Sequence, residues 1–504
     1  MNGRIVGVDI GTQSLKVTVV DETLRGLGSA SSGYAVSFPA PGRAEQAPAL
    51  WEGALAPTIA AALENAQARP TEVIGLGIAG QLDGCIAVDG GNEPLGPCLI
   101  WMDRRASLPA SKHLSGTIRR RCGIVADPGH MAAKISWLKR HGADGAARFH
   151  QPVSWMVARL TGRSVMDRAV ASTTMLYELG GGSWSTELLE AFGIEAAKLP
   201  EIAEAYEPAG TLNADGARAT GLPPGVQVAV GTGDDFSTPL GAGIVRPGRL
   251  ACVLGTAEVV GALDDEARID EANLLETHAY IDGCYFIENP GWFAGGAIDW
   301  FIRTHRLRGV DELNELAAQA PPGSDGVLFL PALGGAMAPE WNPDARGCFY
   351  GLSASHGLPH MARAVMEGCA FAMRDVVERL RAMTVPLQAV RLLGGGARSR
   401  LWAGIRADMV QLPVEVPAEV ATSPIGAAVL AAVACGSAPN VSSAAARRDD
   451  VASIVHPGDG AACDDAYARY RELFEALKPV FKPTRTSPTA CEPVDVVPRE
   501  EVAG

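Results

Sequence analysis

A chain of 504 residues is longer than one hydrophobic core supports, so we expect two or three domains of roughly 100–200 residues. Asp and Glu number 57 against 43 Lys and Arg, and the net charge of −14 disfavours nucleic acid as a partner, because phosphate-backbone binding needs a basic surface. A content of 47% hydrophobic and 20% charged residues predicts a globular protein rather than a disordered one.

The sequence carries no signal for a membrane or for a disulfide scaffold. Its longest apolar stretches, such as residues 425–435, are shorter than the roughly 18 residues of a membrane-spanning helix. A strand-like run at 5–10 follows Met1 closely, which leaves no room for a leader, so we expect a cytoplasmic protein without a membrane partner. The ten cysteines contain no C-x-x-C pair and are expected to be reduced thiols.

A sequence pattern that occurs twice suggests two similar halves. Strand-like residues 5–10 lead through Gly11-Thr12 into 15–20, and 244 residues later 250–254 lead through Gly255-Thr256 into 259–263. Two unrelated hairpins are the alternative, because Gly-Thr turns are common. Duplicated halves would place one hairpin in each of two lobes, with Pro247-Gly248 as turn residues at the boundary.

Strands and helices alternate along the rest of the chain, which predicts an α/β fold. Apolar spacing predicts helices over 132–139 and 153–160. Residues 391–393 predict a strand, 394–396 a glycine loop, and 401–409 a helix that stops before Pro413. We therefore expect a first lobe at 1–245, a second at 246–480, and a flexible tail at 481–504 that is rich in proline.

The glycines, 58 in all, are more abundant than the usual ~7% and include a literal G-x-G-x-x-G at 75–80. This pattern binds dinucleotides only where a helix opens at the third glycine. Here residues 85–88 predict another strand, which disfavours a nicotinamide-dependent oxidoreductase. The alternative is a polar turn that places Gln81 and Asp83 at the end of a strand.

Two acidic turns could take part in phosphate chemistry. Asp9 ends a strand before Gly11-Thr12, where backbone N–H groups and a hydroxyl can meet phosphate oxygens, and Lys16 could add a positive charge. Asp234 and Asp235 follow an apolar run and Gly231-Thr232-Gly233, where a carboxylate could take a proton from a substrate hydroxyl. An ordinary turn carboxylate and a helix N-cap remain alternatives for these aspartates.

The motifs together resemble the FGGY family of carbohydrate kinases, in particular its xylulokinase-like branch, over residues 4 to 480. The matching segments are G-V-D-I-G-T-Q-S-L-K at 7–16, E-Q-x-P-x-x-W at 45–51, G-I-A-G-Q at 77–81, I-W-M-D-R-R at 100–105, G-T-G-D-D at 231–235, L-G-T at 254–256, G-C-F-Y-G-L at 347–352 with H-M-A-R-A-V-M-E at 360–367, G-G-G-A-R-S at 394–399 and S-P-I-G-A-A at 423–428.

The resemblance implies two actin-like (ribonuclease H-like) lobes and an ATP- and Mg²⁺-dependent enzyme. It implies that Asp234 is the general base. It also implies that the carboxylates of Asp9 and Asp234 organise Mg²⁺. The residues implied for the acceptor are Gln81, Leu82, Asp83, Trp101, Asp234 and Asp235. Those implied for ATP are Gly11, Thr12, Gln13, Lys16, Gly255, Thr256, Gly395, Gly396, Ala397 and Ser399.

Three departures from the family pattern bear on the acceptor. Leu82-Asp83-Gly84 stands where xylulose-type enzymes usually carry Met-His-Gly, and a carboxylate accepts hydrogen bonds but cannot donate them. Residues 333–339 stand where relatives often carry Gly-Glu-Arg-Thr-Pro, so this chain lacks the charged Glu-Arg pair near the cleft. Glu258 follows the second Gly-Thr turn, where phosphates would repel it unless a cation intervenes.

We therefore expect a kinase that phosphorylates a ketopentose such as xylulose. A polyol such as erythritol, another pentulose and gluconate are alternative acceptors, and the Gln-x-Asp-Gly turn at 81–84 favours the polyol. A non-catalytic actin-like ATP-binding protein and an oxidoreductase are alternatives from other classes. The expected partners are the small acceptor and ATP, and the oligomeric state, monomer or homodimer, stays open.

Overall fold

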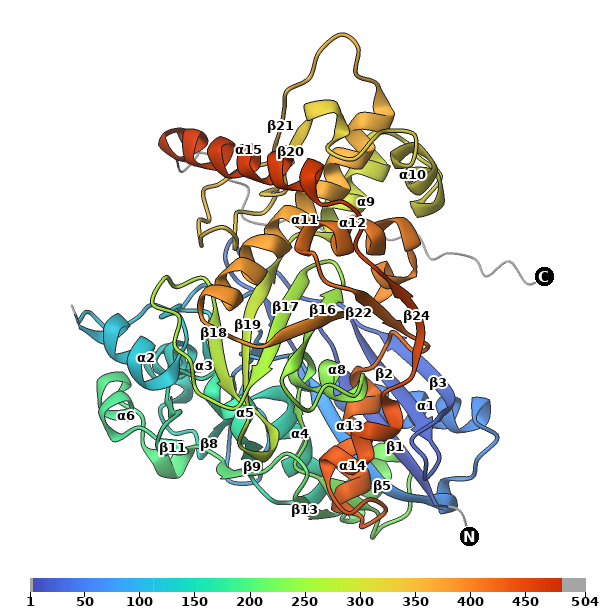
Figure 1. Ribbon diagram of the computed structural model, residues 1–504. Helices are drawn as coiled ribbons and strands as arrows, with labels where there is room; N and C mark the ends of the chain where they lie inside the picture. The colour runs from blue at the N-terminus through green and yellow to red at the C-terminus, as the bar shows by residue number, and fades with distance from the viewer. Residues whose placement is uncertain (1–2, 112, 483–504) are drawn as a thin grey trace.

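Two mixed β-sheets organise the computed structural model, which describes residues 3–111 and 113–482 (Figure 1). In spatial order the first sheet contains β13 (Pro208–Thr211), β14 (Gln227–Ala229), β5 (Val73–Gly80), β1 (Arg4–Ile10), β2 (Ser14–Val20) and β3 (Gly26–Gly33), and β15 (Thr232–Gly233) pairs with β5. The second contains β18 (Glu276–Ala279), β19 (Tyr285–Trp292), β17 (Glu258–Asp264), β16 (Gly248–Leu254), β22 (Leu387–Leu393), β23 (Val414–Pro417) and β24 (Val451–Val455).

The two sheets are built on the same plan. β1 pairs antiparallel with β2 and parallel with β5, and β16 pairs antiparallel with β17 and parallel with β22. Both predicted hairpins are therefore confirmed, and their equal places in the two sheets favour duplicated halves over two unrelated turns.

Helices and short strand pairs surround the sheets. The helices of the first half are α1 (Pro48–Asn65), α2 (Leu114–Cys122), α3 (Met131–Leu138), α4 (Pro152–Thr161), α5 (Arg168–Ser172), α6 (Thr186–Phe192), α7 (Ala214–Thr220) and α8 (Asp234–Gly241). Those of the second are α9 (Gly295–Thr304), α10 (Val310–Ala317), α11 (Leu358–Ala382), α12 (Arg400–Val410), α13 (Ser423–Ala434), α14 (Val441–Ala445) and α15 (Ala461–Leu477). The short strands are β4 (Glu45–Gln46), β6 (Ile86–Val88), β7 (Cys98–Leu99), β8 (Arg148–His150), β9 (Val165–Asp167), β10 (Tyr177–Glu178), β11 (Ser183–Trp184), β12 (Glu201–Ala203), β20 (Leu328–Leu330) and β21 (Cys348–Tyr350).

The predicted local elements are confirmed where the structure describes them. α3 and α4 occupy the two stretches expected to be helical, and β22, a 3-10 turn and α12 form the expected strand, glycine loop and helix. The predicted tail lies outside the described residues except for Phe481 and Lys482, and the ring of Phe481 packs on Phe474 at 5.6 Å. No helix within residues 3–111 and 113–482 is long and apolar enough to cross a membrane.

The G-x-G-x-x-G segment lies inside β5 and opens no helix, so the dinucleotide interpretation is wrong. These glycines serve packing instead. A Cβ added to Gly77 would lie 1.8 Å from the carbonyl oxygen of Ala427, and one added to Gly7 would lie 1.7 Å from that of Pro424. Both partners belong to α13, so glycine allows this helix to lie directly on the backbone of the first sheet.

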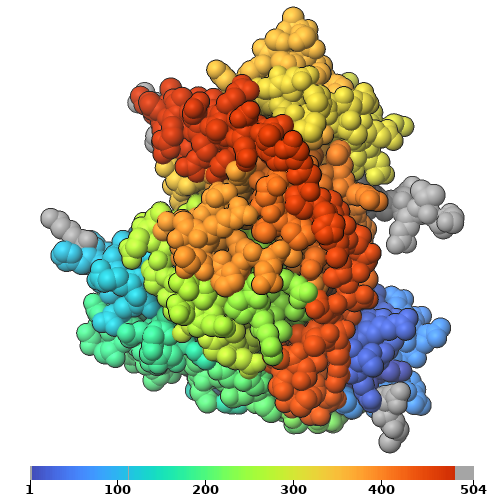
Figure 2. Space-filling view, in the orientation of Figure 1, coloured from blue at the N-terminus to red at the C-terminus, as the bar shows by residue number. Residues whose placement is uncertain are grey.

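α13 therefore crosses from the second half of the chain to the first (Figure 1). On the surface, Figure 2 shows orange-red residues of the C-terminal part beside the blue residues at the start of the chain. α13 packs on β1 and β5 and also against α8, where a Cβ on Gly426 would lie 1.9 Å from the Ser237 carbonyl oxygen. Hydrogen bonds fix the crossing: the Ser237 hydroxyl donates to the carbonyl of Ser423 at 2.7 Å, and the Thr422 hydroxyl donates to that of Thr238 at 2.7 Å.

Gly77→Ala is expected to lower the free energy of unfolding by about 1–3 kcal/mol, because the added methyl group has a backbone carbonyl as its neighbour and cannot be accommodated by a rotamer change. Gly53→Ala is the matched control, since nothing lies within 4 Å of a Cβ there, in the middle of α1. It should raise stability by roughly 0.5–1 kcal/mol. Urea unfolding of both variants measures the difference, and equal stabilities would contradict the close approach of α13.

Candidate active site

The β1–β2 hairpin presents a carboxylate and a tight turn. Asp9 is 2% exposed near the end of β1, and the Lys16 ammonium, half exposed on β2, lies 3.5 Å from Asp9 Oδ2. Burial raises the pKa of the Asp9 carboxyl, and Lys16 opposes that shift. Asp9 Oδ1 is buried and has no hydrogen-bond partner within the described residues. This oxygen is therefore available to a cation or to water.

A chain of hydrogen bonds joins three of the motif segments at Thr12. Trp101 Nε1 donates to Thr12 Oγ1 at 2.9 Å, and Gln46 Nε2 donates to the Thr12 carbonyl at 2.7 Å. Gln81 Nε2 in turn donates to Gln46 Oε1 at 2.8 Å. Gln81 is 2% exposed and its Oε1 has no partner within the described residues, so a ligand hydroxyl could donate to it.

Asp234 stands where β15 ends and α8 begins, beside the end of β5. Gly231 has a φ of +79°, and a Cβ on it would lie 2.2 Å from the carbonyl oxygen of Ile78, so only glycine allows this turn. Burial, followed by the charge of Asp235, raises the pKa of Asp234 well above its usual value. Burial, with the charges of Asp83 and Asp9, raises the pKa of Asp235 to about 7. The carboxylates thus affect one another strongly.

Asp83 lies in the turn after β5, and each of its polar groups has a hydrogen-bond partner from another segment. Its φ is +57°, a left-handed backbone conformation that is uncommon outside glycine and that aspartate adopts more readily than most residues. Its N–H donates to Gln151 Oε1 at 2.8 Å, and its carbonyl accepts from Lys134 Nζ at 2.6 Å. Its carboxylate oxygens lie 3.1 and 3.2 Å from His130 Nδ1. Such multiply fixed, strained residues are typical of functional sites.

Two neighbouring carboxylates favour the protonated form of His130. Burial alone would lower its pKa, but the carboxylates of Asp83 and Glu276 raise it well above the usual value. Burial opposes the charged form of Asp83 as well, yet His130 and Lys134 lower its pKa. The preceding residue, Leu82, packs instead against Gly233, where a Cβ would lie 2.3 Å from Leu82 Cδ2.

Strands of the second half complete the acidic cluster. Glu276 and His278 on β18 and Glu288 on β19 are each at most 3% exposed. Glu276 Oε1 accepts from the Val125 N–H at 2.8 Å and lies 3.7 Å from His130 Nε2. Burial and the charge of Asp235 raise the pKa of Glu288 well above normal. Sequence reasoning missed these residues, because their segments have the pattern of plain buried strands.

Lys134 offers a test by pH. Its ammonium is fully buried, bridges the carbonyls of Asp83 and Ile100, and burial lowers its pKa to about 8. Between pH 8 and about 10.5 the unfolded chain therefore binds a proton that the folded protein has released. The free energy of unfolding of the wild type, relative to Lys134→Met, should rise across this window by up to about 1.4 kcal/mol per pH unit.

Urea unfolding of both proteins at several pH values measures that difference. A difference that does not depend on pH would contradict the lowered pKa. Lys134→Met also leaves the carbonyl of Asp83 without its donor, which should cost about 1–3 kcal/mol at neutral pH, whereas the Ile100 carbonyl still accepts from the Asp103 N–H.

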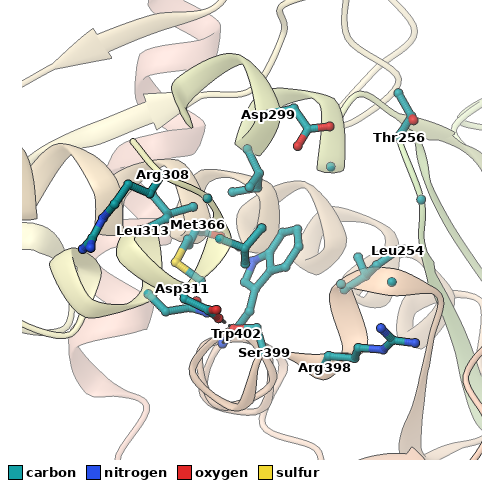
Figure 3. A pocket seen from close by; sticks show the side chains of 18 residues that line it. Leu254, Thr256, Asp299, Arg308, Asp311, Leu313, Met366, Arg398, Ser399 and Trp402 are labelled. Atoms are coloured by element: carbon teal, nitrogen blue, oxygen red, sulfur yellow. Dashed lines mark hydrogen bonds between the residues drawn. The ribbon is translucent and has the colours of Figure 1, made fainter. Parts of the chain in front are cut away.

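The second half contains a cavity of about 740 Å³ bounded by the β16–β17 turn, α9, α10, α11 and α12 (Figure 3). The predicted residues Gly255, Thr256, Gly395, Gly396 and Ser399 line it, whereas Ala397 is buried in the core beside it. The lining residues that the sequence did not single out include Leu254, Asp299, Asn314, Met366 and Trp402. Trp402 lies in the middle of these side chains in Figure 3.

A basic residue offsets Glu258 after the second Gly-Thr turn. Both side chains of the Glu258–Arg406 pair are fully buried, and Arg406 Nη1 and Nη2 donate to the carboxylate at 2.5 and 2.7 Å. Glu258 therefore lies beneath the turn rather than beside it in solvent, and its charge is neutralised without a metal. The residues described contain no cluster of three or more His, Cys, Asp or Glu side chains suited to a metal ion.

Comparison with known proteins identifies the family. The model of the N-terminal domain of the FGGY family of carbohydrate kinases matches residues 4–241, and that of the C-terminal domain matches residues 250–435. The chain belongs to the FGGY family of carbohydrate kinases. The predicted family and the predicted fold of two actin-like lobes are confirmed, and the oxidoreductase alternative is wrong.

Relatives of this carbohydrate kinase act on different acceptors. It is 32% identical to the glycerol kinase of Alkalilimnicola ehrlichii over 86% of this chain and 90% of that protein. It is 29% identical to the gluconokinase of Bacillus subtilis over 86% of this chain and 88% of that protein. A crystal structure described as a xyloylose kinase from Brucella ovis has a TM-score of 0.87 at 29% identity and covers 95% of this chain and all of that one. The acceptor must therefore be inferred from the site itself.

Proposed function

We propose that this kinase transfers the γ-phosphate of MgATP to a hydroxyl group of a neutral ketopentose such as xylulose, with Asp234 as the general base. The observation that carries the proposal is the group of carboxylates at the end of β5. Burial and the charges of Asp235 and Asp9 raise the pKa of Asp234, and burial and the charges of Asp83 and Asp9 raise that of Asp235. A carboxylate with a raised pKa is suited to take a proton from an attacking hydroxyl group.

Asp234 would accept that proton as the hydroxyl oxygen attacks phosphorus directly, without a phosphoenzyme. Phosphoryl transfer depends mainly on positioning and electrostatic stabilisation, so a fixed base beside the phosphate turn is the main contribution of the first half. The Thr12 hydroxyl accepts a hydrogen bond from Trp101 on the acceptor side. It would contact the phosphate once a hydrogen bond to phosphate replaces the one from Trp101.

The charge of the site supports a neutral acceptor. Three aspartates and the buried Glu288 lie on the acceptor side, while His130 is already paired with Asp83. A gluconate carboxylate would be placed next to these groups, and like charges at such distances are unfavourable. Hydroxyl groups of a sugar can instead donate to Asp83 and to the unpartnered Gln81 Oε1.

The nucleotide would occupy the second half and the facing turn of the first. Residues 246–480 would form the nucleotide lobe and residues 1–245 the acceptor lobe. The turns that contain Gly11, Thr12, Gln13, Gly255 and Thr256, together with Lys16, would face the phosphates. The cavity beside Trp402 would take the adenosine, and closure of the lobes in the cytoplasm would exclude water that hydrolyses ATP.

Magnesium fits the first-half turn. Asp9 Oδ1 is a buried carboxylate oxygen with no hydrogen-bond partner among the residues that the structure describes. Mg²⁺ prefers oxygen ligands of this kind, usually one or two carboxylates and substrate phosphates. Asp9, with Asp234 as the second carboxylate, would hold the ion. Bound there, Mg²⁺ would neutralise charge on the phosphates.

A polyol such as erythritol is the second candidate acceptor, and Asp83 favours it. A carboxylate fixed as a hydrogen-bond acceptor suits a ligand that offers only hydroxyl groups at that end, whereas a ketose also presents a carbonyl that needs a donor.

ADP release over a panel of acceptors tests the proposal. The panel contains xylulose and other pentuloses, tetritols, pentitols, glycerol and gluconate. We expect the highest kcat/KM with a ketopentose or a polyol. Faster turnover of gluconate than of any neutral acceptor would contradict the inferred acceptor class. No ADP above background with any acceptor would favour a non-catalytic ATP-binding protein.

A further inference from the structure

The buried pair of Glu258 and Arg406 lies between two parts of the nucleotide cavity. Glu258 is the first residue of β17 and pairs with Leu254 across the turn that carries Gly255 and Thr256. Its carboxylate is held by both terminal nitrogens of Arg406, which comes from α12. The base of the phosphate turn is thus tied to a helix more than 140 residues further along the chain.

Arg406 also supports the wall of the cavity. Its guanidinium carbon lies 4.6 Å from the centre of the Trp402 ring, a distance typical of cation–π stacking. Trp402 Nε1 donates to the Met366 carbonyl at 3.3 Å, and both residues line the cavity. The Arg406 side chain therefore contacts both Glu258, at the base of the Gly255-Thr256 turn, and Trp402, the aromatic wall of the cavity.

Among the residues described, Glu258 is the single charged partner of Arg406. Its remaining polar contacts are with sulfur atoms, Met373 Sδ at 3.2 Å and Cys252 Sγ at 3.8 Å. Replacing a buried ion pair with apolar side chains is often neutral or favourable for stability. The pair is therefore better explained by the geometry it imposes than by the stability it adds.

We infer that Arg406 is a positioning residue for the nucleotide. By contacting Glu258 and Trp402 together, it fixes the distance between the Gly255-Thr256 turn and the aromatic wall, so that the phosphate and nucleoside ends are bound at the same time. Loss of this constraint reduces the affinity for a ligand that spans both ends more than the affinity for one that occupies a single end.

The test uses binding alone and needs no acceptor, so its outcome is independent of the proposed reaction. Arg406→Met/Glu258→Leu removes both charges and keeps the interior apolar. Calorimetric titration should show a dissociation constant for ADP that is about tenfold higher than in the wild type, while that for adenosine changes by less than about threefold. The acceptor KM should stay unchanged wherever turnover is measurable.

Further variants keep the inference testable if the double variant does not fold. Arg406→Lys retains a positive charge for Glu258 but loses the two-pronged hydrogen bonding and the planar stack, so ADP affinity should fall by roughly three- to tenfold. Arg374→Met is the matched control, because Arg374 also stacks on an aromatic ring, Tyr467 at 4.4 Å, and pairs with Asp464 away from the cavity. It should leave ADP affinity unchanged.

Two results would overturn the inference. One is a folded double variant, or a folded Arg406→Lys variant, that binds ADP within about twofold of the wild type. The other is an equal loss of affinity for ADP and for adenosine, because Arg406 would then act on the aromatic wall alone.

Discussion

Asp234→Asn is expected to lower kcat by about 10²–10⁴-fold and to leave the dissociation constant for ADP within about twofold of the wild type. Asparagine has nearly the same shape but cannot accept the proton of the attacking hydroxyl group. The cavity in the second half does not include residue 234, and Asp9 remains to hold Mg²⁺, so nucleotide binding should change little. Single-turnover phosphorylation of the best acceptor and calorimetric titration with ADP measure the two quantities.

The control for this prediction is Asp215→Asn, an exposed aspartate on α7 whose partner is Arg218 at the surface. It should leave kcat unchanged, because surface ion pairs contribute little. Retained turnover in Asp234→Asn would sink the assignment of the base, and a parallel loss of ADP binding would show that the variant had lost more than a proton acceptor.

Asp83→Asn is expected to lower kcat/KM for the preferred acceptor by roughly 10- to 100-fold, which corresponds to one or two hydrogen bonds to a charged group. An amide in this position would also leave His130 without its charged partner on this side. The KM for ATP should change little, since Asp83 lies on the acceptor side. Asp83→His, which introduces a donor, should alter the ranking of acceptors further.

Steady-state kinetics over the panel of sugars and polyols measures this effect. Asp144→Asn, an exposed aspartate after α3, is the control and should behave as the wild type. An unchanged substrate profile in both Asp83 variants would remove Asp83 from the acceptor site, whereas a rise in the KM for ATP alone would place it on the nucleotide side.

Local sequence patterns predicted the elements that depend on neighbouring residues. The two hairpins at Gly11-Thr12 and Gly255-Thr256 combine a strand pattern with a tight turn, and the structure confirms both. Gly75 and Gly77 could not be interpreted in this way. The reason for these glycines is α13, about 350 residues further along the chain, and no local pattern reveals such a contact.

The residues of the candidate site likewise differ in how well local sequence patterns predict them. Asp9, Asp234 and the second-half glycines stand in turns that the sequence marks clearly. His130, Glu276 and Arg406 each act through a partner from a distant segment, and before the fold is known they have the pattern of core helices and strands. The departures from the family pattern at Asp83 and Glu258 fall on residues that the structure pairs with His130 and Arg406, and the sequence named neither partner.

The crossing of α13 has a consequence for how the chain folds as it is synthesised. The last strand of the first sheet, β15, ends at Gly233, yet the helix that covers β1 and β5 begins only at Ser423. Throughout the synthesis of the intervening residues, that apolar face has no native cover, and such surfaces are prone to aggregate. The first sheet therefore reaches its native packing only after α13 has been synthesised.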